Sequence, residues 1–287
     1  MTILTRGMLA TPAVAAVAAV VFGGLTARPS AALTAGELTA HRAIYELKLA
    51  HSRGKSGNIS ARGRILYDFS GSVCEGYVLE FRQVSELDNG EGKVTLSDLR
   101  SNTWEDGAAK SYRFTSQNYL NQQLVDSVDG RAERRPSAIS VTLSKPKDRK
   151  VDLEATIVFP TEHVRLIIEA ARAGKSLLEL PVYDGSETGE KVYNTLTVIG
   201  HEIAPDERIP SDAAAGQQAL AGLKRWPVTV SYFERAGTKT GEQTPVYAIS
   251  FELYENGISR ALMLDYNDFS ISGELKTLEI RDTKACP

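Results

Sequence analysis

Apolar and polar residues alternate along most of the chain with a period of two. In residues 41–49, for example, every second position from Ala43 to Leu49 is apolar, and Glu46 and Lys48 lie between these positions. This alternation is typical of β-strands with one buried face, which usually pair antiparallel. All such segments together give twelve to fourteen expected strands. The clearest others are residues 59–69, 77–84, 139–143, 151–159, 191–199, 228–232, 246–254, 258–264 and 269–280.

One stretch between these strands has the helical period instead. Its apolar positions are spaced i, i+3, i+4 and i+7, which predicts an amphipathic helix over residues 161–173. Thr161 is the expected N-cap, and Gly174 is expected to end the helix. The apolar stripe consists of Val164, Ile167, Ile168 and Ala171.

So many strands with one clear helix predict a mainly β protein built on a single large antiparallel sheet. A doubly wound parallel sheet is not expected, because the short βαβ spacing is absent. An open sheet of this size curls, splits or closes, and closure removes exposed edges. We therefore expect the sheet to wind into an open barrel around the helix at 161–173. An apolar cavity would remain beside the helix if it fills the interior incompletely.

Aromatic residues fall mostly on the apolar faces of the expected strands. A tyrosine ring in such a position offers apolar area, and its hydroxyl group can find a hydrogen-bond partner. Together with the helix stripe, these residues predict the wall of a cavity for an apolar ligand. The alternative is that they form a plain packed core. The residues are Tyr45, Tyr67, Phe81, Phe114, Tyr183, Tyr247 and Phe251.

The N-terminal segment has the order of regions found in a secretory signal peptide. Arg6 is followed by an uncharged Ala/Val-rich run over residues 8–25, and small residues end at Ala32. We expect residues 1–32 to be removed by cleavage after Ala32, with Ala27 and Ala31 as alternative sites. Residues 33–287 would then form one domain. An uncleaved membrane anchor is the alternative, because the run is nearly long enough to span a bilayer.

The chain contains two cysteines, Cys74 and Cys286. In an oxidising compartment such a pair usually forms a disulfide bond. The loop closed would span 286 − 74 = 212 residue steps. The chain-entropy model gives about 5 kcal/mol for so long a loop, and measured values are usually smaller. Two buried free thiols are the alternative. A zinc site is not expected, because neither cysteine has a histidine beside it.

No catalytic, metal-binding or cofactor-binding motif is recognisable in the chain. The four histidines do not form HExxH or another ligand spacing, and G-x-S-x-G and a phosphate-binding glycine-rich loop are absent. The formal net charge of −3 gives no basic footprint for nucleic acid. We therefore predict no catalytic residue, no metal and no cofactor. His163 and His41 are the candidates for a catalytic base if the protein is an enzyme.

Several short motifs occur together between residues 38 and 286. They are HRA at 41–43 followed by Tyr45 and Leu47, FPTEH at 159–163, VYDGSE at 182–187, WPV at 226–228 and FELYENGISR at 251–260. In these motifs and in its two cysteines the chain resembles the EipB family of alphaproteobacterial cell-envelope integrity proteins. The resemblance implies a periplasmic, monomeric β-spiral of about fourteen strands around a helix. It also implies an architecture similar to that of lipoprotein carriers, and a disulfide bond between Cys74 and Cys286.

The resemblance implies a role in envelope maintenance with no established enzymatic activity. We therefore expect a non-enzymatic periplasmic protein that binds an apolar or lipid-like ligand, or a protein partner, in or on the curled sheet. One alternative is a periplasmic hydrolase or transferase that acts on envelope lipid or peptidoglycan. A second alternative is a purely structural interaction module that works through its surface.

Overall fold

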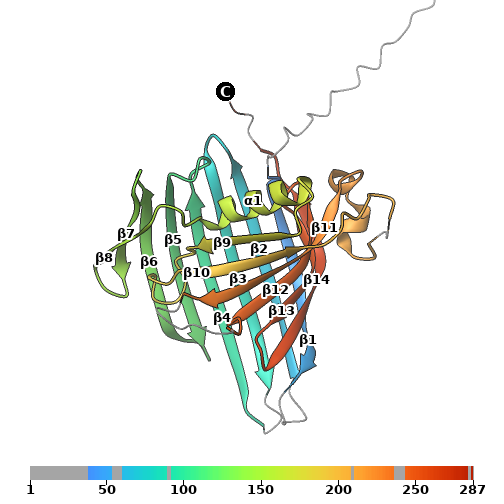
Figure 1. Cartoon of the computed structure of the whole chain (residues 1–287). Helices are drawn as coiled ribbons and strands as arrows, with labels where there is room; N and C mark the ends of the chain where they lie inside the picture. The colour runs from blue at the N-terminus through green and yellow to red at the C-terminus, as the bar shows by residue number, and fades with distance from the viewer. Residues whose placement is uncertain are drawn as a thin grey trace, which may run out of the picture. The chain divides into compact units, whose positions relative to one another are not determined.

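Fourteen strands form one antiparallel sheet in the part of the chain that the computed structural model describes (Figure 1). That part comprises residues 38–53, 60–88, 92–207, 210–235, 243–283 and 286. These residues all belong to the compact unit Thr34–Pro287. The predicted signal peptide at 1–32 lies outside the described residues. The strands are β1 (His41–Ser52), β2 (Ser60–Ser72), β3 (Gly76–Asp88), β4 (Val94–Glu105), β5 (Ser111–Leu120), β6 (Gln123–Arg134), β7 (Ala138–Lys145), β8 (Arg149–Glu154), β9 (Leu177–Val182), β10 (Tyr193–Ile199), β11 (Arg225–Glu234), β12 (Tyr247–Tyr254), β13 (Ser259–Asp265) and β14 (Phe269–Ile280).

The first and last strands are neighbours in the middle of the sheet. β1 pairs with β2 on one side and with β14 on the other. From this pair, strands β2 to β8 continue to one edge and strands β13 to β9 continue to the other. The prediction of a mainly β protein with one large antiparallel sheet is therefore confirmed.

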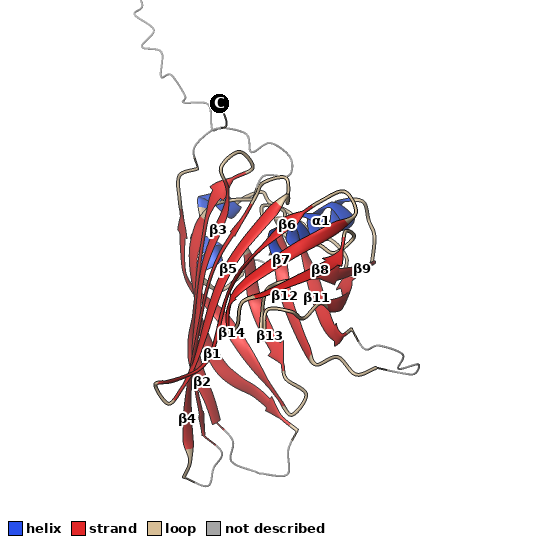
Figure 2. Ribbon diagram, turned by 90° about the vertical axis from the view of Figure 1, so that its left-hand side faces the viewer, coloured by secondary structure: helices blue, strands red, loops and turns tan. Residues whose placement is uncertain are grey.

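The sheet is curled but not closed (Figure 2). Its edge strands β8 and β9 do not pair with each other. Just beyond β8, Val158 forms a parallel bridge to Val182 at the end of β9. The Val158 N–H donates to the Pro181 carbonyl at 2.9 Å, and the Tyr183 N–H donates to the Val158 carbonyl at 3.0 Å. These bonds tie the two edges together where the chain enters the helix.

The predicted helix is present as α1 (Pro160–Arg172), but its start differs from the prediction. The N-cap is Phe159, with Pro160 as the first helical residue, so the expectation that Thr161 is the N-cap is wrong. Proline suits this position because its fixed φ is already helical and the missing N–H would have no partner within the helix. Two short 3₁₀ helices, η1 (Ala213–Gly216) and η2 (Gln218–Leu220), lie between β10 and β11.

Helix α1 packs between opposite walls of the curled sheet. Its Ile167 and Ile168 belong to one buried cluster with Phe69 of β2 and with Trp226 and Val228 of β11. A second cluster covers one face of the neighbouring strands β2, β1, β14 and β13 and includes Ala214 and Leu220 of the 3₁₀ helices, and a third lies under β5 to β8. Within the described ranges, no helix has both the length and the apolar composition needed to cross a bilayer.

The two cysteines form a disulfide bond in the structure. Cys74 lies in the turn between β2 and β3, and Cys286 follows the end of β14. Because β1 lies between β14 and β2 in the sheet, the bond spans the central strand and joins distant parts of the chain.

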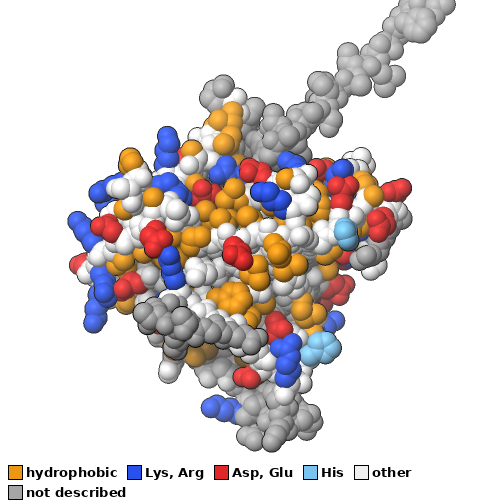
Figure 3. Space-filling model, viewed as in Figure 1, with side chains coloured by type: hydrophobic (Ala, Val, Ile, Leu, Met, Phe, Trp, Pro, Cys, Tyr) orange, Lys and Arg blue, Asp and Glu red, His pale blue; other side chains and the backbone are white. Residues whose placement is uncertain are grey.

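On the face drawn in Figure 3, hydrophobic side chains gather near the centre and charged side chains lie mostly toward the margin. Among the exposed apolar residues are Leu177 of β9 and Val198 of β10, which are direct partners in the strand register. A small exposed pair of this kind is common on soluble proteins and does not by itself mark a site. The interior is therefore the better candidate for a binding site.

Candidate ligand-binding cavity

A cavity of about 370 Å³ lies between the walls of the curled sheet. Strands β1 to β4 contribute to one wall, strands β11 to β13 to the other, and the N-terminal half of α1 covers part of it. The wall follows directly from the period of two, because every second side chain of a strand faces the same side. On β2, for example, Ile65, Tyr67 and Phe69 all line the cavity.

Most of the aromatic residues singled out in the sequence lie on this wall. Tyr45, Tyr67, Phe81, Tyr247 and Phe251 all line the cavity. Together with leucine, isoleucine and valine side chains they give it a largely apolar surface. Tyr45 is fully buried, and its hydroxyl group donates to the Ser259 carbonyl at 2.7 Å. Tyr45 thus supplies apolar area with its ring while its hydroxyl group has a hydrogen-bond partner.

Phe114 and Tyr183 require a correction, because they do not line this cavity. They lie in the third cluster, where their rings meet edge to face with centroids 5.7 Å apart. The Tyr183 hydroxyl donates to the Gly189 carbonyl at 2.6 Å. Phe159 belongs to the same buried cluster and stacks on Tyr112, whose ring in turn stacks on Phe114. Alternation predicts the buried face of the sheet correctly for both residues. The part of the interior next to them is filled by the third cluster.

The helix stripe is divided in the same way. Val164 and Ile167 line the cavity, whereas Ile168 and Ala171 do not. Ile168 and Ala171 are buried in the cluster that joins α1 to β2, β3 and β11. They lie further along the helix, where it packs directly against strand side chains. The apolar stripe is therefore longer than the cavity it helps to enclose.

Both histidines considered as bases are buried on the cavity wall. Burial lowers the pKa of His163 to about 4 and also lowers the pKa of His41. His41 Nδ1 donates to the Thr39 carbonyl at 2.7 Å, and its ring stacks on Tyr67 with centroids 5.5 Å apart. His163 Nε2 lies 3.5 Å from the Thr195 hydroxyl, which donates to the Leu180 carbonyl. Both imidazoles are thus neutral near pH 7 and are held as parts of the wall.

The remaining charge in the cavity is small. Among the described residues, those that line it include no lysine and no arginine. The one carboxyl group among these residues belongs to Asp184, and burial raises the pKa of that group. Asp184 also accepts a hydrogen bond from the Ser186 N–H at 2.9 Å. The described wall therefore offers a bound molecule mainly apolar contacts, with a few hydrogen-bonding groups and one carboxyl group.

Glu105 caps the start of α1, and the sequence did not predict this role. It lies at the end of β4, is 1% exposed, and accepts the N–H groups of Thr161 and Glu162 at 2.7 Å each. It thereby satisfies two of the unpaired donors at the start of α1. Burial raises its pKa to about 7, against the opposing effect of these hydrogen bonds. No local signal could have identified it, because the capping group comes from 56 residues away.

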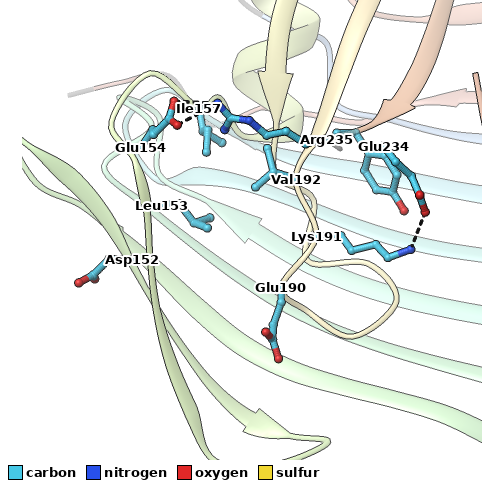
Figure 4. Close-up of a pocket in the computed structure, with 10 residues that line it drawn as sticks. Asp152, Leu153, Glu154, Ile157, Glu190, Lys191, Val192, Glu234 and Arg235 are labelled. Carbon is cyan, nitrogen blue, oxygen red and sulfur yellow. Dashed lines mark hydrogen bonds and ion pairs between the residues drawn. The ribbon is translucent and has the colours of Figure 1, made fainter. Parts of the chain in front are cut away.

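A second hollow of about 450 Å³ lies at the outer side of β8, between this edge strand and residues 190–193 and 234–235 (Figure 4). Four of its charged groups form two ion pairs. Arg235 contacts Glu154 at 2.9 Å, and Lys191 contacts Glu234 at 3.2 Å. A groove in which both cations are already paired has less to offer a ligand than the apolar interior, so we assign the candidate site to the interior.

The fold and the cavity define a class: proteins with one curled, barrel-like antiparallel sheet around a helix and an apolar interior. The family model described as EipB-like matches residues 32–282, and the chain belongs to this family. Over 273 residues it is 38% identical to the cell envelope integrity protein EipB of Brucella abortus (strain 2308), which covers 94% of this chain and 95% of that protein. It is also similar to a crystal structure described as a beta-barrel-like protein of a domain of unknown function from Brucella abortus. That match has a TM-score of 0.77 and 37% identity, and it covers 85% of this chain and 99% of the other.

Proposed function

We propose that this protein maintains the cell envelope without acting as an enzyme, by holding an apolar, lipid-like molecule in the cavity of its curled sheet. The observation that carries the proposal is the aromatic-lined cavity of about 370 Å³. Its volume lies at the lower end of the range common for ligand sites, about 300–1,000 Å³. The envelope role is supported by the similarity to the cell envelope integrity protein EipB of Brucella abortus.

We also propose that the protein works in the periplasm after removal of residues 1–32. The disulfide bond between Cys74 and Cys286 supports this location, because disulfides persist in oxidising compartments. The order of charged, apolar and small residues at the N-terminus supports export.

The size of the cavity sets the scale of the ligand and of its affinity. At about 30 Å³ for each group of the size of a water molecule, the cavity holds about a dozen such groups. Burial of about ten methylene groups gains roughly 8 kcal/mol, at about 0.8 kcal/mol each, before the cost of association is subtracted. We therefore expect a single chain of this length to bind with a dissociation constant in the micromolar range or weaker.

A cavity-filling variant tests this function. Val164 faces the cavity from α1, so Val164→Phe places additional ring atoms in the space that the ligand needs. We expect it to weaken the binding of the neutral apolar fluorophore N-phenyl-1-naphthylamine at least tenfold. The fluorescence of the probe during titration gives the dissociation constant.

Val198→Phe is the matched control, because Val198 lies on β10 and is exposed outside the cavity. It should leave binding unchanged, and thermal melting should show that both variants fold. If Val164→Phe binds the probe as tightly as the wild type, the ligand does not occupy this cavity.

A further inference from the structure

Tyr266 reaches between the two walls of the cavity. It follows β13, in the short turn that leads to β14. Its half-buried ring lies 5.1 Å from the ring of Tyr247 on β12, measured between centroids. Burial raises the pKa of Tyr266, and the interaction of its hydroxyl group with the Gln83 side chain on β3 opposes that rise. Tyr247 and Gln83 line the cavity from opposite walls, so Tyr266 lies across the interior from one wall to the other.

The lining of the cavity ends at the level where Tyr266 meets β3. Three partners in the strand register mark this level, and all three line the cavity: Tyr45 of β1, Ile65 of β2 and Gln83 of β3. Because every second residue of a strand faces the same side, the next inward-facing residues are also partners in the register. None of them lines the cavity, and they are Leu47, Gly63 and Ser85. Tyr266 therefore stands at the limit of the cavity, and two of the three residues just beyond this limit are small.

The turn that carries Tyr266 is held in place by Arg53, which follows β1. The Arg53 guanidinium group donates to both carboxylate oxygens of Asp265, at 2.7 and 2.8 Å, and to the Asn267 carbonyl at 3.0 Å. The Arg53 N–H donates to the Asp268 carbonyl at 2.8 Å. Two parallel bonds between a guanidinium group and a carboxylate fix orientation as well as distance. The residues on both sides of Tyr266 are thus anchored to the end of β1.

A second aromatic ring supports Tyr266. Phe269, the first residue of β14, stacks on it with centroids 5.2 Å apart. Tyrosine has few side-chain torsions, so holding its ring between neighbours costs little conformational entropy. The anchored turn and the two ring contacts, with Tyr247 and Phe269, make Tyr266 a stiff boundary.

We propose that Tyr266 closes this end of the cavity and sets the length of apolar chain that the cavity accepts. A chain that enters away from Tyr266 buries one methylene group after another until its tail meets the ring. Further methylene groups stay outside the cavity and add little to the affinity. This inference rests on the proposed function, and it names the residue that determines chain length.

A series of 1-alkanols with 8, 10, 12 and 14 carbons tests the inference, by displacement of N-phenyl-1-naphthylamine from the protein. Each methylene group that becomes buried strengthens binding up to about fourfold. The affinity of the wild type should rise with chain length and then level off. Tyr266→Ala leaves room for about three more methylene groups, at about 30 Å³ each, so its affinity should level off two to four carbons later. At the longest chain it should bind about tenfold more tightly than the wild type.

Two control variants separate the ring from other effects. Tyr266→Phe keeps the ring and loses the hydroxyl group, so its affinity should level off at the same length as that of the wild type. Tyr119→Ala removes the same atoms from a half-buried ring on β5, outside the cavity, and should also keep the wild-type length. Thermal melting shows which variants fold. Tyr266→Leu is the milder truncation, and it should lengthen the accepted chain by less than Tyr266→Ala does.

The outcomes distinguish this inference from the proposed function. If both truncated variants level off at the wild-type length, Tyr266 does not bound the chain, and the apolar cavity stands. If Tyr266→Phe shifts the length as far as Tyr266→Ala, the ring is not the boundary and the inference is refuted. If no alkanol displaces the probe from the wild type, the proposed function itself is refuted.

Discussion

The filled and the hollow parts of the interior are built from the same sequence pattern. The filled part lies under β5 to β8 and contains Phe114 and Tyr183, and the hollow part lies between β1 to β4 and β11 to β13. In both, aromatic residues on alternate positions of antiparallel strands face inward. The pattern therefore reports which side of a strand is buried, and it does not report whether the space on that side is occupied.

Three glycines allow close packing in the filled part. A Cβ atom at Gly185 would lie 2.4 Å from the Phe114 ring, and one at Gly130 would lie 2.6 Å from it. A Cβ atom at Gly189 would lie 2.8 Å from side-chain atoms of Leu143 and Val128. Three backbone segments thus approach the side chains of the filled part more closely than any other residue would permit. Glycine also permits a close approach in the hollow part, where a Cβ atom at Gly257 would lie 2.7 Å from Leu38.

The largest expected effect comes from removing a ring in each part. Phe114→Ala should lower the free energy of unfolding by about 4 kcal/mol, because the ring is enclosed by Tyr112, Tyr183 and the glycine backbone. Phe81→Ala should cost less than about 2 kcal/mol, because one side of its half-buried ring already faces the cavity. Urea unfolding of both variants measures the difference. Equal losses would mean that the cavity wall is as tightly packed as the filled part.

The disulfide bond joins the turn between β2 and β3, two strands of the hollow part, to the segment after β14. Cys74→Ser should destabilise the protein by roughly 2–5 kcal/mol, because the unfolded chain regains the freedom that the long loop had removed. Thermal melting under oxidising conditions should show the loss, and a reducing agent should bring the wild type down to the variant. A variant that melts within a degree of the wild type would contradict a stabilising bond.

The sequence predicts the strands and the helix well because each depends on local periodicity. Its prediction for the interior is only partly right, since five of the seven aromatic residues line the cavity and two belong to the filled part. Whether Phe114 faces a ligand depends on Gly185 and on Phe159, which are distant in sequence. The same limit applies to Thr161, which was expected to cap the helix. Glu162 accepts the Phe159 N–H from within the helix, but the Thr161 and Glu162 N–H groups are capped by Glu105 on β4, and no local pattern contains that information.

Glu105 acts on the hollow part through α1, because it caps the start of this helix, whose N-terminal half lines the cavity. Its pKa is raised from 4.5 to about 7, so between these pH values the folded protein keeps a proton that the unfolded chain loses. The ionisation of Glu105 therefore lowers the free energy of unfolding as the pH rises from about 4.5 to 7, by about 3 kcal/mol at most. His163, with its pKa lowered to about 4, has the opposite pH dependence: it lowers the free energy of unfolding as the pH falls below about 6.5.

Comparison of Glu105→Gln with the wild type isolates the contribution of Glu105 to the pH dependence of stability. Glutamine cannot ionise, and His163 is present in both proteins. The variant loses one of the two acceptors for the helix N–H groups, so it should be about 1 kcal/mol less stable than the wild type near pH 4.5. This deficit should shrink or reverse by pH 8, where the wild type carries a buried charge. Urea unfolding of both proteins across this range gives the difference. A constant difference would show that Glu105 ionises at the same pH in the folded and unfolded states, and that the two N–H groups of α1 fully offset its burial.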